Sequence, residues 1–192
     1  MTILVFDIHV PEIYGAITNQ SLWSAIKHSD VLFMSYFLSF ALLFTYWCAH
    51  HFITSVYAKN IDIKLTNINA LFLFFVAMVP FSAHLLGLYS TVQVAIVVFA
   101  VHVICIGLTL FWLRRYVEVA EVIENTRLTP VERRHSYIRV LFPVFTAIVA
   151  IGFSFLHKEL SLTLLTLGIL FNLLPKSTTI ISWFIDPFLA KK

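Results

Sequence analysis

Residues 36–81, YFLSFALLFTYWCAHHFITSVYAKNIDIKLTNINALFLFFVAMVPF, decide the fold. Two apolar runs flank a short polar turn, and the pattern predicts two helices joined at that turn. Trp47, His50, His51 and Asn69 all lie near the joined ends of these helices. Polar side chains within a bilayer usually bond to a neighbouring helix. The stretch therefore predicts a membrane hairpin whose polar cluster needs a partner from a further helix.

The composition of the whole chain is that of a membrane protein. Of its 192 residues, 60% are hydrophobic and 12% are charged, whereas a soluble domain carries about 25% charged residues. The mean hydropathy is +0.91. Five segments reach the length of about 20 residues that a membrane helix needs, namely 31–56, 68–88, 91–117, 137–156 and 160–183. We therefore predict an all-α fold, a polytopic membrane helix bundle that forms a single membrane domain over residues 1–192 in a lipid bilayer.

The last of these segments is interrupted at Pro175 and Lys176. It either kinks there or ends there, with an interfacial piece after it. Trp183 and the final Lys191 and Lys192 suit a headgroup layer, so we favour the interfacial piece.

The basic residues predict the orientation. If the five segments alternate, one side of the membrane receives Lys59, Lys64, Arg114, Arg115, Arg127, Arg133, Arg134, Arg139, Lys191 and Lys192. The opposite side receives Lys27 and Lys158, and Lys176 stays unassigned. Basic loops are retained in the cytoplasm. We therefore expect a multi-pass protein of the cell inner (plasma) membrane with a cytoplasmic C-terminus.

The basic connection between the third and fourth of these segments has local structure of its own. From Arg114 to Asn125 the helical period continues past the membrane, and Thr129-Pro130-Val131-Glu132 has the form of a capping box at the start of the next helix. We interpret this connection as a solvated hairpin rather than a ligand site.

The first ten residues, MTILVFDIHV, form an apolar run of half the length needed to cross a bilayer. They lack the basic start and the cleavage site of a signal peptide. We interpret them as the outer end of a first membrane helix that arrives from the cytoplasm. On this interpretation more helix lies upstream of Met1, which would then be an internal methionine.

The sequence offers little support for a metal centre or an active site. Cys48 and Cys105 lie in apolar runs without CxxC spacing. His50 and His51 are adjacent and therefore point to different helix faces. There is no HExxH motif, and no acidic residue lies inside a confident span. We predict a protein that is not an enzyme, with no metal and no cofactor, and the net charge of +3 is too small to suggest a nucleic-acid partner.

The order of these features resembles the transmembrane protein 175 family of potassium channels, in its single-repeat prokaryotic form. The resemblance rests on Thr2-Ile3-Leu4-Val5, Val10-Pro11-Glu12, Tyr36, Ser39-Phe40, Tyr46-Trp47-x-x-His50-His51, and Asn69 through Phe75-Val76 to Pro80-Phe81. The family signature Arg-x-x-x-Phe-Ser-Asp of the first helix is absent, and by this resemblance it would lie upstream of Met1.

The resemblance implies a six-helix subunit that assembles as a homotetramer, conducts potassium ions and lines its pore with the first helix. It implies that Ile3 and Phe6 form apolar selectivity rings, with Thr2 beside Ile3. It also implies that His50, Trp47, Asn69 and His51 form a polar network that holds the missing signature.

Other interpretations stay open. Ile3 and Phe6 could face lipid, and the Trp and His residues could lie at the water boundary, as they do in many membrane proteins. A membrane enzyme or transporter that uses intramembrane His residues is a second hypothesis, and a truncated fragment that folds without conducting is a third.

Overall fold

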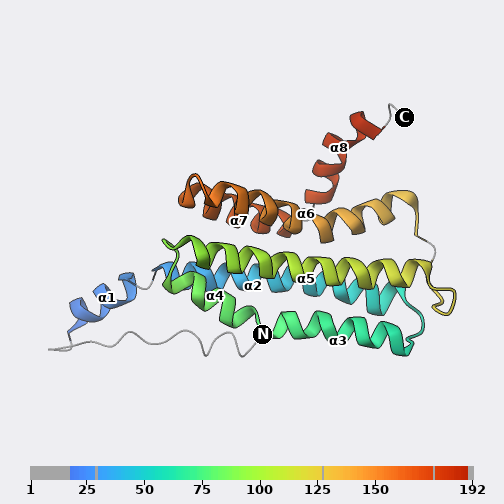
Figure 1. The fold of residues 1–192 in the computed structure, drawn as a ribbon, viewed down its shortest axis with the longest axis horizontal. Helices are drawn as coiled ribbons and strands as arrows, with labels where there is room; N and C mark the ends of the chain where they lie inside the picture. The colour runs from blue at the N-terminus through green and yellow to red at the C-terminus, as the bar shows by residue number, and fades with distance from the viewer. Residues whose placement is uncertain (1–17, 29, 127, 175, 190–192) are drawn as a thin grey trace.

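The computed structural model describes residues 18–28, 30–126, 128–174 and 176–189, and these residues form a bundle of helices (Figure 1). In chain order they are α1 (Asn19–His28), α2 (Asp30–His51), the π-helical turn η2 (Phe52–Tyr57), α3 (Ile63–Ala77), α4 (Val79–Leu88), α5 (Gln93–Val119), α6 (Pro130–Ser154), α7 (Lys158–Leu173) and α8 (Ser177–Leu189).

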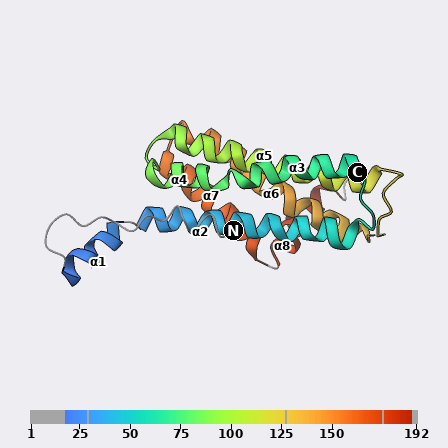
Figure 2. The ribbon, with the colours of Figure 1, turned by 90° about the horizontal axis from the view of Figure 1, so that it is seen from below.

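Helix α5 is the centre of the bundle. It packs against α3 and α4 on one side and against α6 on the other, and α7 packs on α6. Figures 1 and 2 show α2 running alongside α5 and the α3–α4 pair. Ile96, Ile106 and Leu110 of α5 are completely buried. One face of α5 is therefore enclosed by neighbouring helices, whereas apolar side chains of the opposite face, such as Leu108 and Trp112, are exposed.

The helices confirm the prediction of a polytopic membrane bundle. Four of them are long and apolar enough to cross a membrane: Phe33–Tyr57, Ile63–Leu88, Gln93–Val119 and Pro130–Ser154. The pair Lys158–Leu173 and Ser177–Trp183 would make a fifth span, but it is bent by 108° at its break. The chain is a multi-pass membrane protein, and α8 leaves the bundle where Pro175 interrupts the last apolar segment.

Two helix starts carry side-chain caps. Asp62 accepts a hydrogen bond of 2.7 Å from the backbone N–H of Leu65, so α3 begins at Ile63 rather than at residue 68. Thr129 and Glu132 form the predicted capping box at the start of α6. Caps of this kind fix where a helix begins because they satisfy N–H groups that have no partner within the helix.

One sequence expectation was wrong in this region. The helical period was expected to continue from Arg114 to Asn125, but α5 ends at Val119. Asn125 instead forms an isolated β-bridge with Ala58, and Lys59 donates a 2.8 Å bond from its N–H to the carbonyl of Glu124. Backbone pairing with the chain after η2 replaces the last helical turns.

A histidine side chain forms hydrogen bonds on both sides of the break between α3 and α4. Pro80 has no N–H to donate to the preceding turn, and the helix is interrupted at Met78. Nε2 of His102, on α5, lies 2.8 Å from the carbonyl oxygen of Phe75 and therefore donates to it. Nδ1 of the same ring lies 2.7 Å from the Ser82 hydroxyl. This ring links α5 to both halves of the broken span.

Gly107 allows α2, α5 and α6 to approach one another closely. A Cβ at this position would clash with Val144 of α6 and with the Tyr46 hydroxyl of α2. That hydroxyl donates a 3.3 Å bond to the carbonyl of Val103. Small residues at such crossings are typical of membrane helices.

Candidate functional site

His50 and Asn69 are joined across the α2–α3 hairpin. Nε2 of His50 lies 2.6 Å from Oδ1 of Asn69. The His50 ring stacks on Phe72 of α3, with centroids 4.9 Å apart and planes inclined by 7°. The contact fixes the ring between the two helices. Within the described residues, no side chain bonds to Nδ1 of His50 or Nδ2 of Asn69. These two nitrogens can therefore form hydrogen bonds with another segment.

Trp47 and His51 lie on a different face of α2. Their rings stack with centroids 5.3 Å apart, and His51 Nδ1 lies 3.3 Å from the Ser55 hydroxyl. Trp47 is 52% exposed. The structure thus divides the four predicted network residues into two pairs. Trp47 and His51 share one face of α2, whereas His50 points from another face of α2 toward Asn69 on α3.

The Trp47–His51 pair ends a row of rings that sequence analysis missed. The α2 aromatic stripe consists of Phe33, Phe37, Phe40, Phe44, Trp47 and His51, all of them exposed. Phe40 stacks on Phe44 at 6.4 Å, and Phe44 on Trp47 at 6.2 Å. The spacing alternates between four and three residues, which is the seam spacing of helices that pack along their length. That spacing in the sequence would have revealed the stripe.

The predicted pore residues Ile3, Phe6 and Thr2 lie outside the described residues, so their role stays a prediction.

A second polar cluster surrounds Glu118 at the inner end of α5. The guanidinium of Arg114 is fully buried between the rings of Tyr57, at 4.1 Å, and Tyr137, at 4.8 Å. Its Nε donates a 3.0 Å bond to Ser136, and its Nη1 lies 3.5 Å from Glu118. Burial of a charge is tolerated here because rings, a hydroxyl and a carboxylate surround it.

Glu118 is shared by several donors. Arg115 approaches it at 3.8 Å, and Arg133 and Tyr137 of α6 bond to it as well. The interpretation of this connection as a solvated hairpin was therefore wrong for Arg114, which ties η2, α5 and α6 together. The i,i+4 spacing of Arg114 and Glu118 was the available sequence signal.

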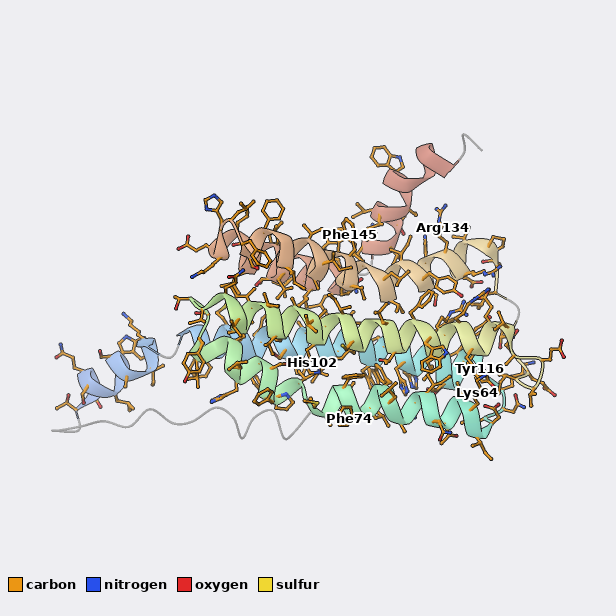
Figure 3. All side chains as sticks on the ribbon, viewed as in Figure 1. Lys64, Phe74, His102, Tyr116, Arg134 and Phe145 are labelled. Carbon is orange, nitrogen blue, oxygen red and sulfur yellow. The ribbon has the colours of Figure 1, made fainter. Side chains whose placement is uncertain are left out.

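Asp62 connects α3 to the same end of α5. Its carboxylate accepts a 2.5 Å bond from the Tyr116 hydroxyl, and Lys64 lies 5.1 Å over the Tyr116 ring. Figure 3 shows Lys64 and Tyr116 side by side at this end of the bundle. The Tyr116 bond, together with the backbone N–H of Leu65, lowers the pKa of Asp62.

The described residues contain no group of three or more His, Cys, Asp or Glu side chains that could hold a metal ion. The inner ends of α2 and α3 offer an amide–imidazole pair and an exposed aromatic face, both of which suit contact with another helix.

Comparison with known families bears directly on this hairpin. Residues 1–80 match the family model of the endosomal/lysosomal potassium channel TMEM175. The match contains the His50–Asn69 pair and Trp47, and it confirms the resemblance inferred from the sequence over these residues. No curated protein matches the chain.

Proposed function

We propose that this chain is a subunit of a potassium channel of the TMEM175 type. The observation that supports the proposal most is the match of residues 1–80, because that range contains the predicted pore residues and the His50–Asn69 pair. The arrangement of several membrane spans around α5 is compatible with a channel subunit.

Ion selection on this proposal comes from apolar rings. Four copies of Ile3, and of Phe6 one turn later, would surround the symmetry axis of a homotetramer. Such a constriction resists water and ions by dewetting. Potassium sheds its water shell at lower cost than sodium, so the rings favour potassium without a cage of oxygen ligands.

The proposal also gives a role to Nδ1 of His50 and Nδ2 of Asn69, the two nitrogens that the His50–Asn69 contact leaves available. We expect these atoms to bond to polar groups of a further helix that packs on the hairpin. The α2 aromatic stripe would then lie against that helix and the neighbouring subunit. This accounts for an exposed face with seam spacing on a helix that is otherwise buried.

The orientation follows from the basic residues. We propose that the end carrying Lys59, Lys64 and the Glu118 cluster faces the cytoplasm, that the C-terminus lies on the same side, and that the membrane is the inner (plasma) membrane.

Potassium efflux from liposomes tests the proposal. The chain is reconstituted in liposomes with potassium inside, and Ile3→Asn and Phe6→Asn are measured beside it. We expect efflux that is faster for potassium than for sodium, and an altered preference in both variants. Unchanged rates and preference in both variants would remove these residues from the pore.

A further inference from the structure

A groove between α6 and α8 combines a basic end with an apolar wall. Its volume is about 870 Å³, within the range of roughly 300–1,000 Å³ that is usual for ligand sites. It is lined by Leu128, Pro130, Arg133, Arg134, Tyr137, Ile138, Leu141, Phe142, Phe145 and Ile181. Figure 3 places Arg134 and Phe145 apart along α6, beside α8.

The apolar wall follows the axis of α6. Tyr137, Leu141 and Phe145 are spaced by four residues and lie on one helix face, which spans about 12 Å at a rise of 1.5 Å per residue. Ile181 of α8 faces this row from the other side. Phe145 is 64% exposed, so the groove is open at its apolar end. A long narrow wall of this kind fits a hydrocarbon chain.

The basic end has more positive than negative charge. Arg133 and Arg134 line the groove, and none of the lining residues that the structure describes is acidic. The carboxylate that Arg133 contacts is Glu118, which also serves Arg114 and Arg115. Because Glu118 is shared in this way, it offsets only part of the positive charge of Arg133, and the end of the groove at Arg133 and Arg134 attracts an anion.

We propose that this groove binds an anionic glycerophospholipid of the leaflet on its side of the membrane. The phosphate lies against Arg133 and Arg134, and an acyl chain lies between the Tyr137–Phe145 row and Ile181. Basic pockets between membrane helices on the cytoplasmic side commonly hold acidic headgroups, and this end of the bundle is the one that the basic residues assign to the cytoplasm. The inference does not depend on the proposed channel activity.

Native mass spectrometry of the delipidated full chain tests the proposal. Dioleoyl phosphatidylglycerol and dioleoyl phosphatidylcholine are titrated separately, so that only the headgroup charge differs. We expect the anionic lipid to bind about fivefold more tightly, with the preference falling as salt is raised. Equal binding of the two lipids by the unaltered chain would overturn the proposal, whatever the variants do.

Two variants locate the site. Arg134→Gln is expected to reduce the preference for the anionic lipid, whereas Arg115→Gln, on α5 and outside the groove, is expected to retain it. Leu141→Trp fills the apolar wall and should weaken both lipids. Equal losses in Arg134→Gln and Arg115→Gln would contradict the site. A change in the number of bound subunits in Leu141→Trp, without a change in lipid binding, would assign the groove to a second copy of the chain instead.

Discussion

The two polar clusters of this bundle lie near the same end of the molecule and differ in how their members are held. The Glu118 cluster is charged, and its members contact one another across η2, α5 and α6, although Nη2 of Arg114 is buried without a hydrogen-bond partner among the described residues. The His50–Asn69 pair has two members, contains no carboxylate or guanidinium, and has its His50 ring stacked on Phe72. A buried guanidinium needs partners within the fold, whereas His50 and Asn69 keep hydrogen-bonding atoms that another segment can use. We therefore expect the first cluster to contribute mainly to stability and the second to contribute mainly to the proposed channel function.

Removing the carboxylate of the first cluster should have the largest effect. Glu118→Gln leaves the buried guanidinium of Arg114 without its carboxylate, which costs about 3–5 kcal/mol of unfolding free energy. Denaturant titration followed by tryptophan fluorescence measures the change. The matched control is Glu121→Gln, an exposed carboxylate of the same connection, which should stay within about 0.5 kcal/mol. Equal effects of the two variants would contradict the assignment of stability to Glu118.

Removing a ring from the α2 aromatic stripe should weaken assembly rather than folding. Trp47→Ala truncates a half-exposed side chain, and if the stripe packs on another segment the loss is about 2 kcal/mol of association free energy. The assembled fraction measured by native mass spectrometry reports it. Trp112→Ala on α5, which removes a ring of similar exposure, is the control. Equal assembly of both variants would assign the stripe to lipid.

Replacing the amide of the second cluster should reduce conduction with little loss of stability. Asn69→Leu keeps the volume but removes the bond to His50, and we expect potassium flux to fall about tenfold, equivalent to ~1.4 kcal/mol. The unfolding free energy should fall by no more than about 1.5 kcal/mol. Asn67→Leu alters an exposed amide of the same helix. If it lowered flux as much as Asn69→Leu, the pair would have no special role.

The smallest effect is expected at Asp62, which connects α3 to α5. Its pKa is lowered in the folded state from the ordinary 3.8, chiefly by the Tyr116 bond. Its contribution to stability is therefore present above pH 3.8 and is lost as the pH falls through the folded-state pKa. The Tm of the unaltered chain should exceed that of Asp62→Asn at pH 7, and the difference should shrink on acidification.

Tyr116→Phe tests the cause of that shift. It removes the hydroxyl that donates to Asp62 and should remove most of the pH-dependent difference. If the difference between Asp62→Asn and the unaltered chain grew on acidification, the assigned sign would be wrong.

Sequence reasoning reached the membrane class, four of the five predicted spans and the hairpin because apolar length is read directly from the chain. The capping box at Thr129 was equally visible. Sequence reasoning did not predict the burial of Arg114, because a basic residue near a helix end is usually interpreted as an indicator of membrane orientation. It also did not separate Trp47 and His51 from His50 and Asn69, because residue spacing alone does not say which helix face has a neighbour. Sequence reasoning also missed the hydrogen bond from His102 to the carbonyl of Phe75, because that bond depends on how α5 packs against α3.

The reversal potential of reconstituted protein, with potassium on one side of a planar bilayer and sodium on the other, tests the central claim most directly. The account predicts a reversal potential displaced toward the potassium equilibrium value, and a smaller displacement when Ile3→Asn replaces the apolar ring. A reversal potential at zero that Ile3→Asn leaves unchanged would contradict it, as would a bilayer that carries no current at all.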